Sequence, residues 1–565
     1  MNSSIPGLSA RFGKALLIFL LILAGYMMSF SWDENDALDT VYWAETGQIR
    51  ALLEFRHLEQ RMLPLWLWQW LNHVGIETGM RAVLDLWDFT TAALSVMLLY
   101  CILFELTNSR PISFAGSFAY ATAHCVWIYV GSGRLYSTSM LLAFAGYYLA
   151  LQMGKEISEG RRLVIAFGAA TYACFACTFW LVHAFNAIGA GLLLFFLPPA
   201  KSFFRRCSYL TVYSLTGIIL VGVLAVSCLL YVQIPLERQE IKAWMAAAGT
   251  QPMQFDALSP MKASFGQAHG ILAIYELPYM INGLMLKDPH LVKMASLPWQ
   301  LGKFVLVWLL LAPVYLYPLY LMWKGDTRMR ILCGALYVPL AINMYFSVGW
   351  LGSDVQRFMP SMLSQYVFGA LAVQDLLRRV PRPRLLAGML VACLAFIAAD
   401  NFVESLLPSQ RRYMVLEAEM KTVRPFLKPD DLPVNFGRDA SITYLTMTNL
   451  YGGARFLNTT NDYTKYAWDR TDWMNYFNEK VKTVESRGGR AFVMDRLALG
   501  QNPPEAAWSE KQHPRPSLKQ FASFLQNEYC LLPSFQIEGR RYFQLSPRTS
   551  GCPASALAPA AENRP

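Results

Sequence analysis

The chain has 565 residues, of which 55% are hydrophobic and only 16% are charged, and its formal net charge is +10. Soluble domains carry about 25% charged residues, so this composition excludes an ordinary soluble protein and indicates a membrane protein with several spans. The positive charge does not indicate nucleic-acid binding, because the basic residues fall largely in short loops between apolar runs, as the positive-inside rule describes.

Long apolar runs predict about eleven transmembrane helices. The first run follows Arg11 and Lys14, and the polar stretch behind it, SWDEND, offers no small-residue cleavage site. We therefore interpret this run as a retained span rather than a signal peptide. Basic clusters between the later runs place the N-terminus and the basic loops in the cytoplasm. The expected spans lie near residues 15–31, 85–106, 112–130, 135–153, 162–179, 182–197, 208–231, 302–323, 329–349, 358–377 and 385–403.

One apolar run does not fit this series. Residues 62–76 are short for a span and contain three tryptophans, Asn72 and His73, so we predict an interfacial helix there. The odd number of spans then places three long segments outside the cytoplasm, which are residues 32–84, residues 233–299 and everything after about residue 404.

The predicted fold class is an all-α polytopic membrane bundle with a small C-terminal α/β extramembrane domain. We expect residues 1–403 to form the transmembrane domain, residues 404–548 the α/β domain, and residues 549–565, rich in Ala, Pro and Ser, a disordered tail. Strand-like residues 491–494 and 541–545 and helix-like residues 518–528 support the α/β assignment. Cys530 and Cys552 can form a disulfide if this domain lies outside the cytoplasm.

The segment that directly follows the first span is rich in carboxylates. Asp33, Glu34, Asp36 and Asp39 fall within seven positions, and a helix would place the three aspartates on one face. The simplest interpretation is that one residue caps a helix and the others complement its N-terminal dipole. Capping does not explain so many acids at the membrane boundary. The functional hypothesis is a carboxylate that takes a proton from an acceptor hydroxyl or holds a divalent metal ion.

Basic side chains outside the cytoplasm form the second candidate group. His57 and Arg61 precede the interfacial helix, where they either contact lipid headgroups or form part of a phosphate clamp. Arg134 and Arg357 lie in short extracytoplasmic loops, each at the start of a span, and so depart from the positive-inside pattern. This departure makes them more informative than the many basic residues on the cytoplasmic side.

Three motifs, in this order, resemble those of the GT-C glycosyltransferases. WDENDALDTVYWAETGQ resembles the family's first outer loop, where an acidic pair precedes a Tyr–Ala–Gly pattern, and the matching residues are Asp33, Glu34, Tyr42, Ala44 and Gly47. Residues 133–137, Gly-Arg-Leu-Tyr-Ser, resemble the family's middle Arg-x-Tyr loop. Residues 356–360, Gln-Arg-Phe-Met-Pro, resemble its late Arg-Tyr-x-x-Pro loop, with Phe for Tyr and one residue fewer before the proline. The resemblance covers roughly residues 15–403 and is to the protein mannosyltransferase and aminoarabinose transferase type.

The resemblance implies a glycosyltransferase that moves a hexose or pentose from a polyprenyl phosphate to a glycan, lipid or protein acceptor outside the cytoplasm, with inversion. It implies that Asp33 is the base or a metal ligand, with Asp36 as second choice and Glu34 beside it. The donor phosphate would be bound by Arg357, Arg134, Arg61 and His57.

The resemblance leaves two alternatives for the cofactor, either none or a divalent cation, Mg²⁺ or Mn²⁺. The reason is that residues 131–137 lack a second acid that some family members carry. The expected partners include membrane lipids and no nucleic acid. We expect a bacterial inner-membrane protein whose N-terminus is cytoplasmic and whose C-terminal domain lies in the periplasm.

Two other functions remain open. A transporter or flippase of lipid-linked glycans usually carries ionisable or helix-breaking residues near the bilayer centre, whereas the charges here gather at span ends. A polymerase or ligase of preassembled glycans is expected to have a large outer loop rich in Arg and His, and residues 233–299 contain few of either. Both comparisons favour the glycosyltransferase.

Overall fold

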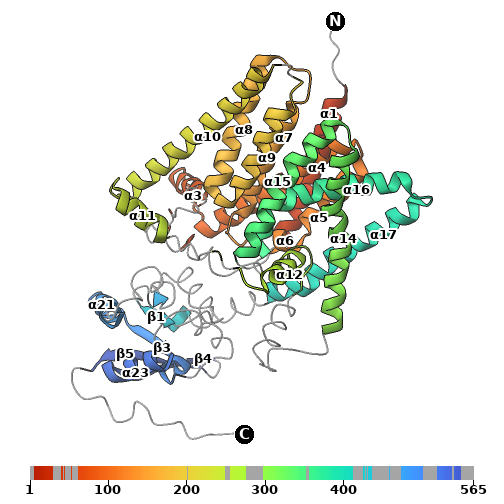
Figure 1. Ribbon diagram of the computed structural model, residues 1–565. Coiled ribbons are helices and arrows are strands. Elements are labelled where there is room, and N and C mark those ends of the chain that lie inside the picture. Colours follow the sequence, from red (N-terminus) through yellow and green to blue (C-terminus); the bar gives the residue numbers. More distant parts are fainter. Residues whose placement is uncertain are drawn as a thin grey trace. The chain divides into compact units, whose positions relative to one another are not determined.

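The computed structural model divides into two compact units, Met1–Gln410 and Arg411–Pro565, and each is considered by itself (Figure 1). In the first unit the structure describes residues 6–29, 40–41, 44, 53, 61–199, 202–247, 253, 255–274, 297–350 and 355–410. In the second unit it describes residues 411, 424–426, 428, 431–435, 457–458, 473–500, 518–537 and 540–548.

The first unit is a bundle of helices. In chain order these are α1 (Pro6–Met28), α3 (Met62–His73), α4 (Met80–Thr107), α5 (Arg110–Ala121), α6 (His124–Tyr129), α7 (Tyr136–Gln152), α8 (Glu159–Phe179), η2 (Leu181–His183), α9 (Ala184–Phe196), α10 (Phe203–Val232), α11 (Arg238–Ala247), α12 (Ser259–Ile271), α14 (Leu297–Lys324), α15 (Thr327–Gly349), η5 (Val355–Ser361), α16 (Met362–Arg379), α17 (Pro383–Asn401) and the π-helical turn η6 (Phe402–Leu406). Within the described residues, six helices are long and apolar enough to cross a membrane, namely α4, α8, α10, α14, α15 and the run that begins with α17.

Helices occupy the positions of all the expected spans, but four of these spans are not single α-helices. The expected span 182–197 begins in η2, and 385–403 ends in η6. The expected span 112–130 is divided, because α5 ends at Ala121 and α6 begins at His124. At the break the side-chain amide of Asn401 donates to the Thr122 carbonyl at 2.8 Å, which satisfies a backbone group that is costly to leave unpaired in a bilayer. The expected span 358–377 begins as the 3₁₀ turn η5, which contains Pro360, a residue that an α-helix interior tolerates poorly.

The core of the first unit lies among the inner helices. Buried Val96, Phe144, Leu193, Leu336 and Phe368 come from α4, α7, α9, α15 and α16 respectively. These five helices therefore form one apolar core rather than separate pairs. The loops at their ends are held where the core places them.

Glycine allows a close contact between two helices of this core. A Cβ atom at Gly189 of α9 would lie only 2.5 Å from the Ala335 carbonyl oxygen of α15, so only glycine fits. Substituting a larger residue would push α9 and α15 apart.

The predicted interfacial helix corresponds to α3. It has 12 residues and is thus about 18 Å long, well short of a bilayer core of about 30 Å. Met62, Pro64 and Leu65 are buried, whereas Trp66 and Trp70 are more than half exposed. This one-sided burial agrees with a helix that lies along the bundle instead of crossing the membrane.

The second unit contains a five-stranded sheet with the order β2-β1-β3-β5-β4. Strands β1 (Leu432–Asn435), β2 (Leu457–Asn458) and β3 (Ala491–Met494) pair in parallel, whereas β5 (Arg540–Pro547) is antiparallel to both β3 and β4 (Tyr529–Ile537). The helical segments are η7 (Arg424–Phe426), α21 (Trp473–Glu485), α22 (Asp495–Ala498) and α23 (Leu518–Glu528).

Aromatic packing and one buried ion pair stabilise the second unit. Phe477 of α21 packs edge to face against Phe521 and Phe524 of α23. The fully buried Asp431 pairs with Arg490 at 2.7 Å, which ties the start of β1 to the start of β3. The predicted small α/β domain is therefore present, with its expected strand at 491–494 and helix at 518–528. Cys530 is disulfide-bonded, and the predicted tail, 549–565, lies outside the described residues.

Candidate functional site

A tight turn between α6 and α7 carries Arg134. Gly131, Gly133 and Leu135 have positive φ angles of 78°, 70° and 55°. Glycine adopts this region freely, but leucine does so only at a cost, so its surroundings must hold Leu135 in place. Leu135 is fully buried. The turn therefore presents Arg134 in a defined direction.

Charged side chains in the first turns of α4 hold this turn. The fully buried Asp88 accepts hydrogen bonds from the Gly131 amide, at 3.0 Å, and from the Ser137 hydroxyl. Arg81 donates to the Gly131 carbonyl at 2.6 Å and pairs with Asp85 at 3.0 Å. Both polar groups of Gly131 are thus bound by α4, which fixes the base of the Arg134 turn.

Gln356 joins the Arg134 turn to the loop that carries Arg357. Its side-chain oxygen accepts a hydrogen bond from the Tyr136 hydroxyl and lies 3.5 Å from Nη1 of Arg134. Gln356 and Arg134 are 222 positions apart in the sequence. The structure therefore brings the two predicted arginine loops to one place, while the phosphate-binding role of the arginines stays a prediction.

Arg357 lies in η5 with only 8% of its surface exposed. Its guanidinium stacks on Trp350, with Cζ 3.6 Å from the ring centroid. The Ser347 hydroxyl donates to the Arg357 carbonyl at 3.4 Å and so ties η5 to the end of α15. A guanidinium can stack on an aromatic face and also bind phosphate or carboxylate in a planar, bidentate way. Burial strengthens such charge interactions, so this arrangement suits an anionic ligand.

Aromatic rings form a wall beside the Arg134 turn. Tyr129 and Tyr136 pack edge to face with centroids 5.2 Å apart, and Tyr136 packs on Trp180 at 4.6 Å. The Asn186 side chain of α9 donates to the Pro360 carbonyl at 2.9 Å, which connects the same region to η5. These contacts make the surroundings of the two arginines rigid before any ligand binds.

The other predicted site residues fall in the first outer loop. Arg61 lies directly before α3 and is buried. Asp33, Glu34, Asp36 and His57 lie outside the described residues. Four described residues of this loop are buried, namely Thr40, Val41, Ala44 and Leu53. The loop is therefore packed against the protein at these points.

A second polar cluster, which the sequence reasoning missed, ties together α12, α14 and α17. Lys303 and Asp400 form an ion pair at 2.7 Å, and their side chains are 1% and 6% exposed. Lys303 also donates to the Ala273 carbonyl at 3.0 Å, and the Asn401 side chain accepts from the Ala273 amide at 2.7 Å. The cluster thus fixes the residues that follow α12. The sequence does carry a signal for this cluster, because Lys303 lies inside the expected span 302–323 and Asp400 inside the expected span 385–403.

Two stacked histidines adjoin this cluster. The rings of His124 and His269 lie 4.5 Å apart, and His124 also binds the His269 carbonyl at 2.8 Å and the Ser405 hydroxyl at 3.1 Å. Burial, followed by the charge of Lys303, lowers the pKa of His269 to about 4, so this ring is neutral at pH 7. Because the folded state disfavours its protonation, the contribution of His269 to stability is present above pH ~6.5 and falls as the pH drops toward 4.

We expect Lys303→Met to destabilise the protein by about 3–5 kcal/mol, because it leaves Asp400 as an uncompensated buried charge. The double variant Lys303→Met/Asp400→Leu should lie much closer to wild type, because it removes both charges. Thermal unfolding of the purified variants in detergent measures both effects. A double variant as unstable as the single one would contradict the pairing.

No metal site is evident in the part of the chain that the structure describes. There, no group of three or more His, Cys, Asp and Glu side chains is placed to hold an ion. The acidic segment that carries the metal hypothesis lies outside that part, so the choice between no cofactor and Mg²⁺ or Mn²⁺ stays open.

Comparison with known proteins identifies the fold. No protein-family model matches the sequence, and a search of curated proteins finds no significant relative. The crystal structure of ArnT from Cupriavidus metallidurans bound to undecaprenyl phosphate matches with a TM-score of 0.53 at 10% sequence identity, covering 99% of this chain and 100% of ArnT. The chain has the fold of ArnT.

Two further structures are similar to the chain. ArnT from Cupriavidus metallidurans in the apo state has a TM-score of 0.49 at 12% identity, with 96% of this chain and 98% of ArnT covered. An oligosaccharyltransferase from Archaeoglobus fulgidus, in complex with zinc and sulfate, has a TM-score of 0.46 at 11% identity, with 94% and 72% covered.

The likeness to ArnT confirms the predicted fold class, a polytopic helical membrane bundle with a small additional C-terminal domain. The long apolar helices of the bundle, together with this likeness, support an integral membrane protein. One fold supports many reactions, so the activity has to be argued from the site itself.

Proposed function

We propose that this chain is a membrane glycosyltransferase that moves a sugar from a polyprenyl-phosphate donor to an acceptor outside the cytoplasm. The observation that carries the proposal is the junction at Gln356, which joins the Arg134 turn to the Arg357 loop within a GT-C fold. The likeness to ArnT bound to undecaprenyl phosphate supports a polyprenyl-phosphate donor.

In this proposal Arg357 and Arg134 bind the donor phosphate. Negative charge grows on the phosphate as the sugar–oxygen bond breaks, and cations already in position stabilise that charge in the transition state. The stack on Trp350 orients Arg357 in advance, so that little reorganisation is needed when the donor binds. Arg61 and His57 would add charge from the first outer loop.

Asp33 is the proposed base, with Asp36 as second choice and Glu34 beside it. The acceptor hydroxyl oxygen attacks the anomeric carbon while its proton passes to the carboxylate. The bond between that carbon and the phosphate oxygen breaks, and its electron pair leaves with the polyprenyl phosphate. Attack and departure on opposite faces invert the configuration. The alternative role of these acids is to hold a divalent cation.

The transferred sugar in this proposal is a hexose or a pentose, and the acceptor is a glycan, a lipid or a protein.

The rival functions differ in what they make in detergent. A flippase of lipid-linked glycans changes no bond, so it yields no free polyprenyl phosphate from purified donor in micelles. A polymerase yields products of increasing length from preassembled glycans. The proposed enzyme yields one equivalent of polyprenyl phosphate for each sugar transferred, and this stoichiometry separates the three functions.

The decisive experiment compares purified Asp33→Asn and Asp36→Asn in sugar transfer from a polyprenyl-phosphate donor. A base or metal ligand predicts that Asp33→Asn is inactive, because the amide is neither basic nor anionic, with a loss of about 10²–10⁴-fold. A helix cap predicts a nearly silent variant, because asparagine caps about as well as aspartate.

Asp326 supplies the matched control for that experiment. Its side chain caps α15 by accepting from the Met329 amide at 2.7 Å. Asp326→Asn should therefore keep both activity and melting temperature. If Asp33→Asn and Asp36→Asn behave like Asp326→Asn, the carboxylates of the outer loop are caps and surface charges.

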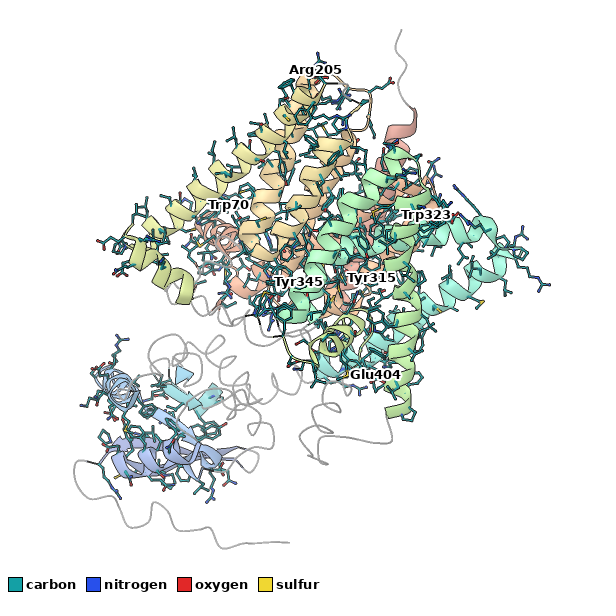
Figure 2. All side chains as sticks on the ribbon, in the orientation of Figure 1. Trp70, Arg205, Tyr315, Trp323, Tyr345 and Glu404 are labelled. Carbon is teal, nitrogen blue, oxygen red and sulfur yellow. The ribbon has the colours of Figure 1, made fainter. Side chains whose placement is uncertain are left out.

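We also propose that the N-terminus is cytoplasmic and the C-terminal unit lies outside the cytoplasm, in the periplasm if the source is a bacterium. Arg205 and Glu404 lie at opposite ends of the helical unit (Figure 2), as expected if the basic loops face the cytoplasm. The disulfide at Cys530 supports an oxidising compartment. A reporter fused after Pro408 should be active only as an extracytoplasmic enzyme, and cytoplasmic activity would reverse the topology.

A further inference from the structure

An apolar groove runs between α5, α14, α16 and α17, on the part of the bundle where α16 and α17 splay apart from their connecting turn (Figure 1). Its cavity volume is about 280 Å³. Two polar residues reach it, and both are bonded to protein, since Gln365 donates to Ser361 at 2.7 Å and Tyr366 to the Ala119 carbonyl at 3.2 Å. The groove therefore offers contact area to an apolar ligand but few hydrogen-bonding groups.

The shape of the groove suits a hydrocarbon chain. Its lining on α16 extends from Gln365 to Leu377, which is about 18 Å at 1.5 Å per residue. That length slightly exceeds one leaflet of a hydrocarbon core of about 30 Å. Small residues such as Ala115 and Gly369 make room for the chain between the helices. A single acyl chain lying along α16 would fill such a space.

The cytoplasmic end of the groove is basic. Its lining there includes Pro111, Leu377 and Ala387. Arg110 and Arg378 directly adjoin the first two, and Arg384 lies one helical turn before the third. All three arginines are exposed, and within the described residues none has an ion pair, whereas the neighbouring Arg379 pairs with Asp375 at 2.8 Å.

A polar hollow adjoins the groove at the same end. It is lined by Phe104, Asn108, Ser109, Arg110 and Pro111, at the turn between α4 and α5. Asn108 makes this turn with a positive φ of 50°. Pro111 lines both cavities, so a polar hollow with a cation lies directly beside an apolar groove. A ligand that fits both parts has an anionic head and a hydrocarbon tail.

We propose that this composite site binds one anionic phospholipid of the cytoplasmic leaflet. One of its two acyl chains lies in the groove, and its phosphate lies at Arg110, within reach of Arg378 and Arg384. The site is separate from the proposed donor site. Arg357 lies before the start of α16, whereas Arg378 lies in its last turn, Arg384 in the first turn of α17, and Arg110 at the start of α5. The inference does not depend on the proposed sugar transfer.

Native mass spectrometry of the purified full chain tests the site with two probes of identical acyl chains, phosphatidylglycerol and phosphatidylcholine. We expect wild type to retain phosphatidylglycerol preferentially. The triple variant Arg110→Gln/Arg378→Gln/Arg384→Gln should bind it up to about a hundredfold more weakly, because each basic residue near a membrane surface adds to the attraction of anionic lipid. A control triple with the same charge change, Arg161→Gln/Lys324→Gln/Arg328→Gln, should behave like wild type.

A second pair of variants tests the groove itself. Gly369→Leu places a side chain in the groove and should reduce retention of phosphatidylglycerol. Gly369→Ala adds a methyl group in ordinary contact with Val314, at 3.6 Å, and should retain the lipid. Equal retention of the two probes by wild type, or equal losses in the two triple variants, would overturn the role of the headgroup.

The tail of the polyprenyl donor is the rival occupant of the groove. If Gly369→Leu weakens binding of polyprenyl phosphate while the Arg110 triple variant leaves it unchanged, the donor tail fills the groove from the outer side and the proposal is wrong. If polyprenyl phosphate binding survives Gly369→Leu and phosphatidylglycerol binding does not, the phospholipid site stands.

Discussion

Replacing Arg357 with alanine is expected to reduce sugar transfer by about 10²–10³-fold while the protein stays folded. The guanidinium is nearly buried and stacked on Trp350, so its charge acts in a region of low dielectric, where it is worth more than a charge in water. Arg357→Lys should recover only part of the activity, because an ammonium group cannot form the bidentate fork or the flat stack. Initial rates with a polyprenyl-phosphate donor, together with melting temperatures, measure both effects.

Arg379→Ala is the matched control for this experiment. Arg379 also lies over an aromatic ring, 5.7 Å from the Tyr320 centroid, and pairs with Asp375, but its side chain is 60% exposed at the opposite end of α16. Exposed pairs contribute little, so this variant should keep wild-type activity. Full activity in Arg357→Ala would show that the loop's resemblance to GT-C motifs is accidental.

The second large effect is expected at Asp88. Asp88→Leu leaves the buried Gly131 amide without its acceptor, at a cost of about 1–3 kcal/mol, while the Ser137 hydroxyl keeps Thr91 as a partner at 2.8 Å. The Arg134 turn should shift as a result, and a displacement of about 1 Å can reduce activity by about 10²-fold. We therefore expect Asp88→Leu to lower both the melting temperature and the rate of sugar transfer.

Asp88→Asn separates positioning from direct chemistry. The amide oxygen can accept from the Gly131 amide while the amide nitrogen donates to the Ser137 oxygen, so the turn should stay in place. A positioning role therefore predicts that Asp88→Asn keeps most of its activity. If this variant melts like wild type yet is inactive, the charge of Asp88 takes part in the reaction and our interpretation of the residue is wrong.

Local patterns predicted much of the fold. Hydropathy located the helices because an apolar run of sufficient length has few alternatives in a membrane. The strand at 491–494 and the helix at 518–528 also carry their periodicity in the sequence itself. The break after Ala121 was not predictable, because it is stabilised by Asn401, which lies 279 positions further along the chain. The strand order β2-β1-β3-β5-β4 likewise depends on pairing between distant segments.

The candidate site shows the same division. Arg134 and Arg357 could be found from the sequence because each breaks a rule about charge at membrane surfaces. Gln356 and Trp350 carry no such signal, and they matter only because of what they touch. Asp88 and Lys303 had a signal, a charge inside an apolar run, but their roles required knowledge of their partners.

The sequence by itself determined that this is a multi-span membrane protein, which loops carry the basic clusters, and which two arginines stand apart from them. These properties follow from composition and from local transfer free energies, which each residue contributes largely on its own. Only the tertiary structure decided that the Arg134 turn meets the Arg357 loop at Gln356 and that Asp88 holds that turn. The physical reason is that such contacts arise from the packing of helices far apart in the chain, where the energy belongs to pairs of residues and not to either residue alone.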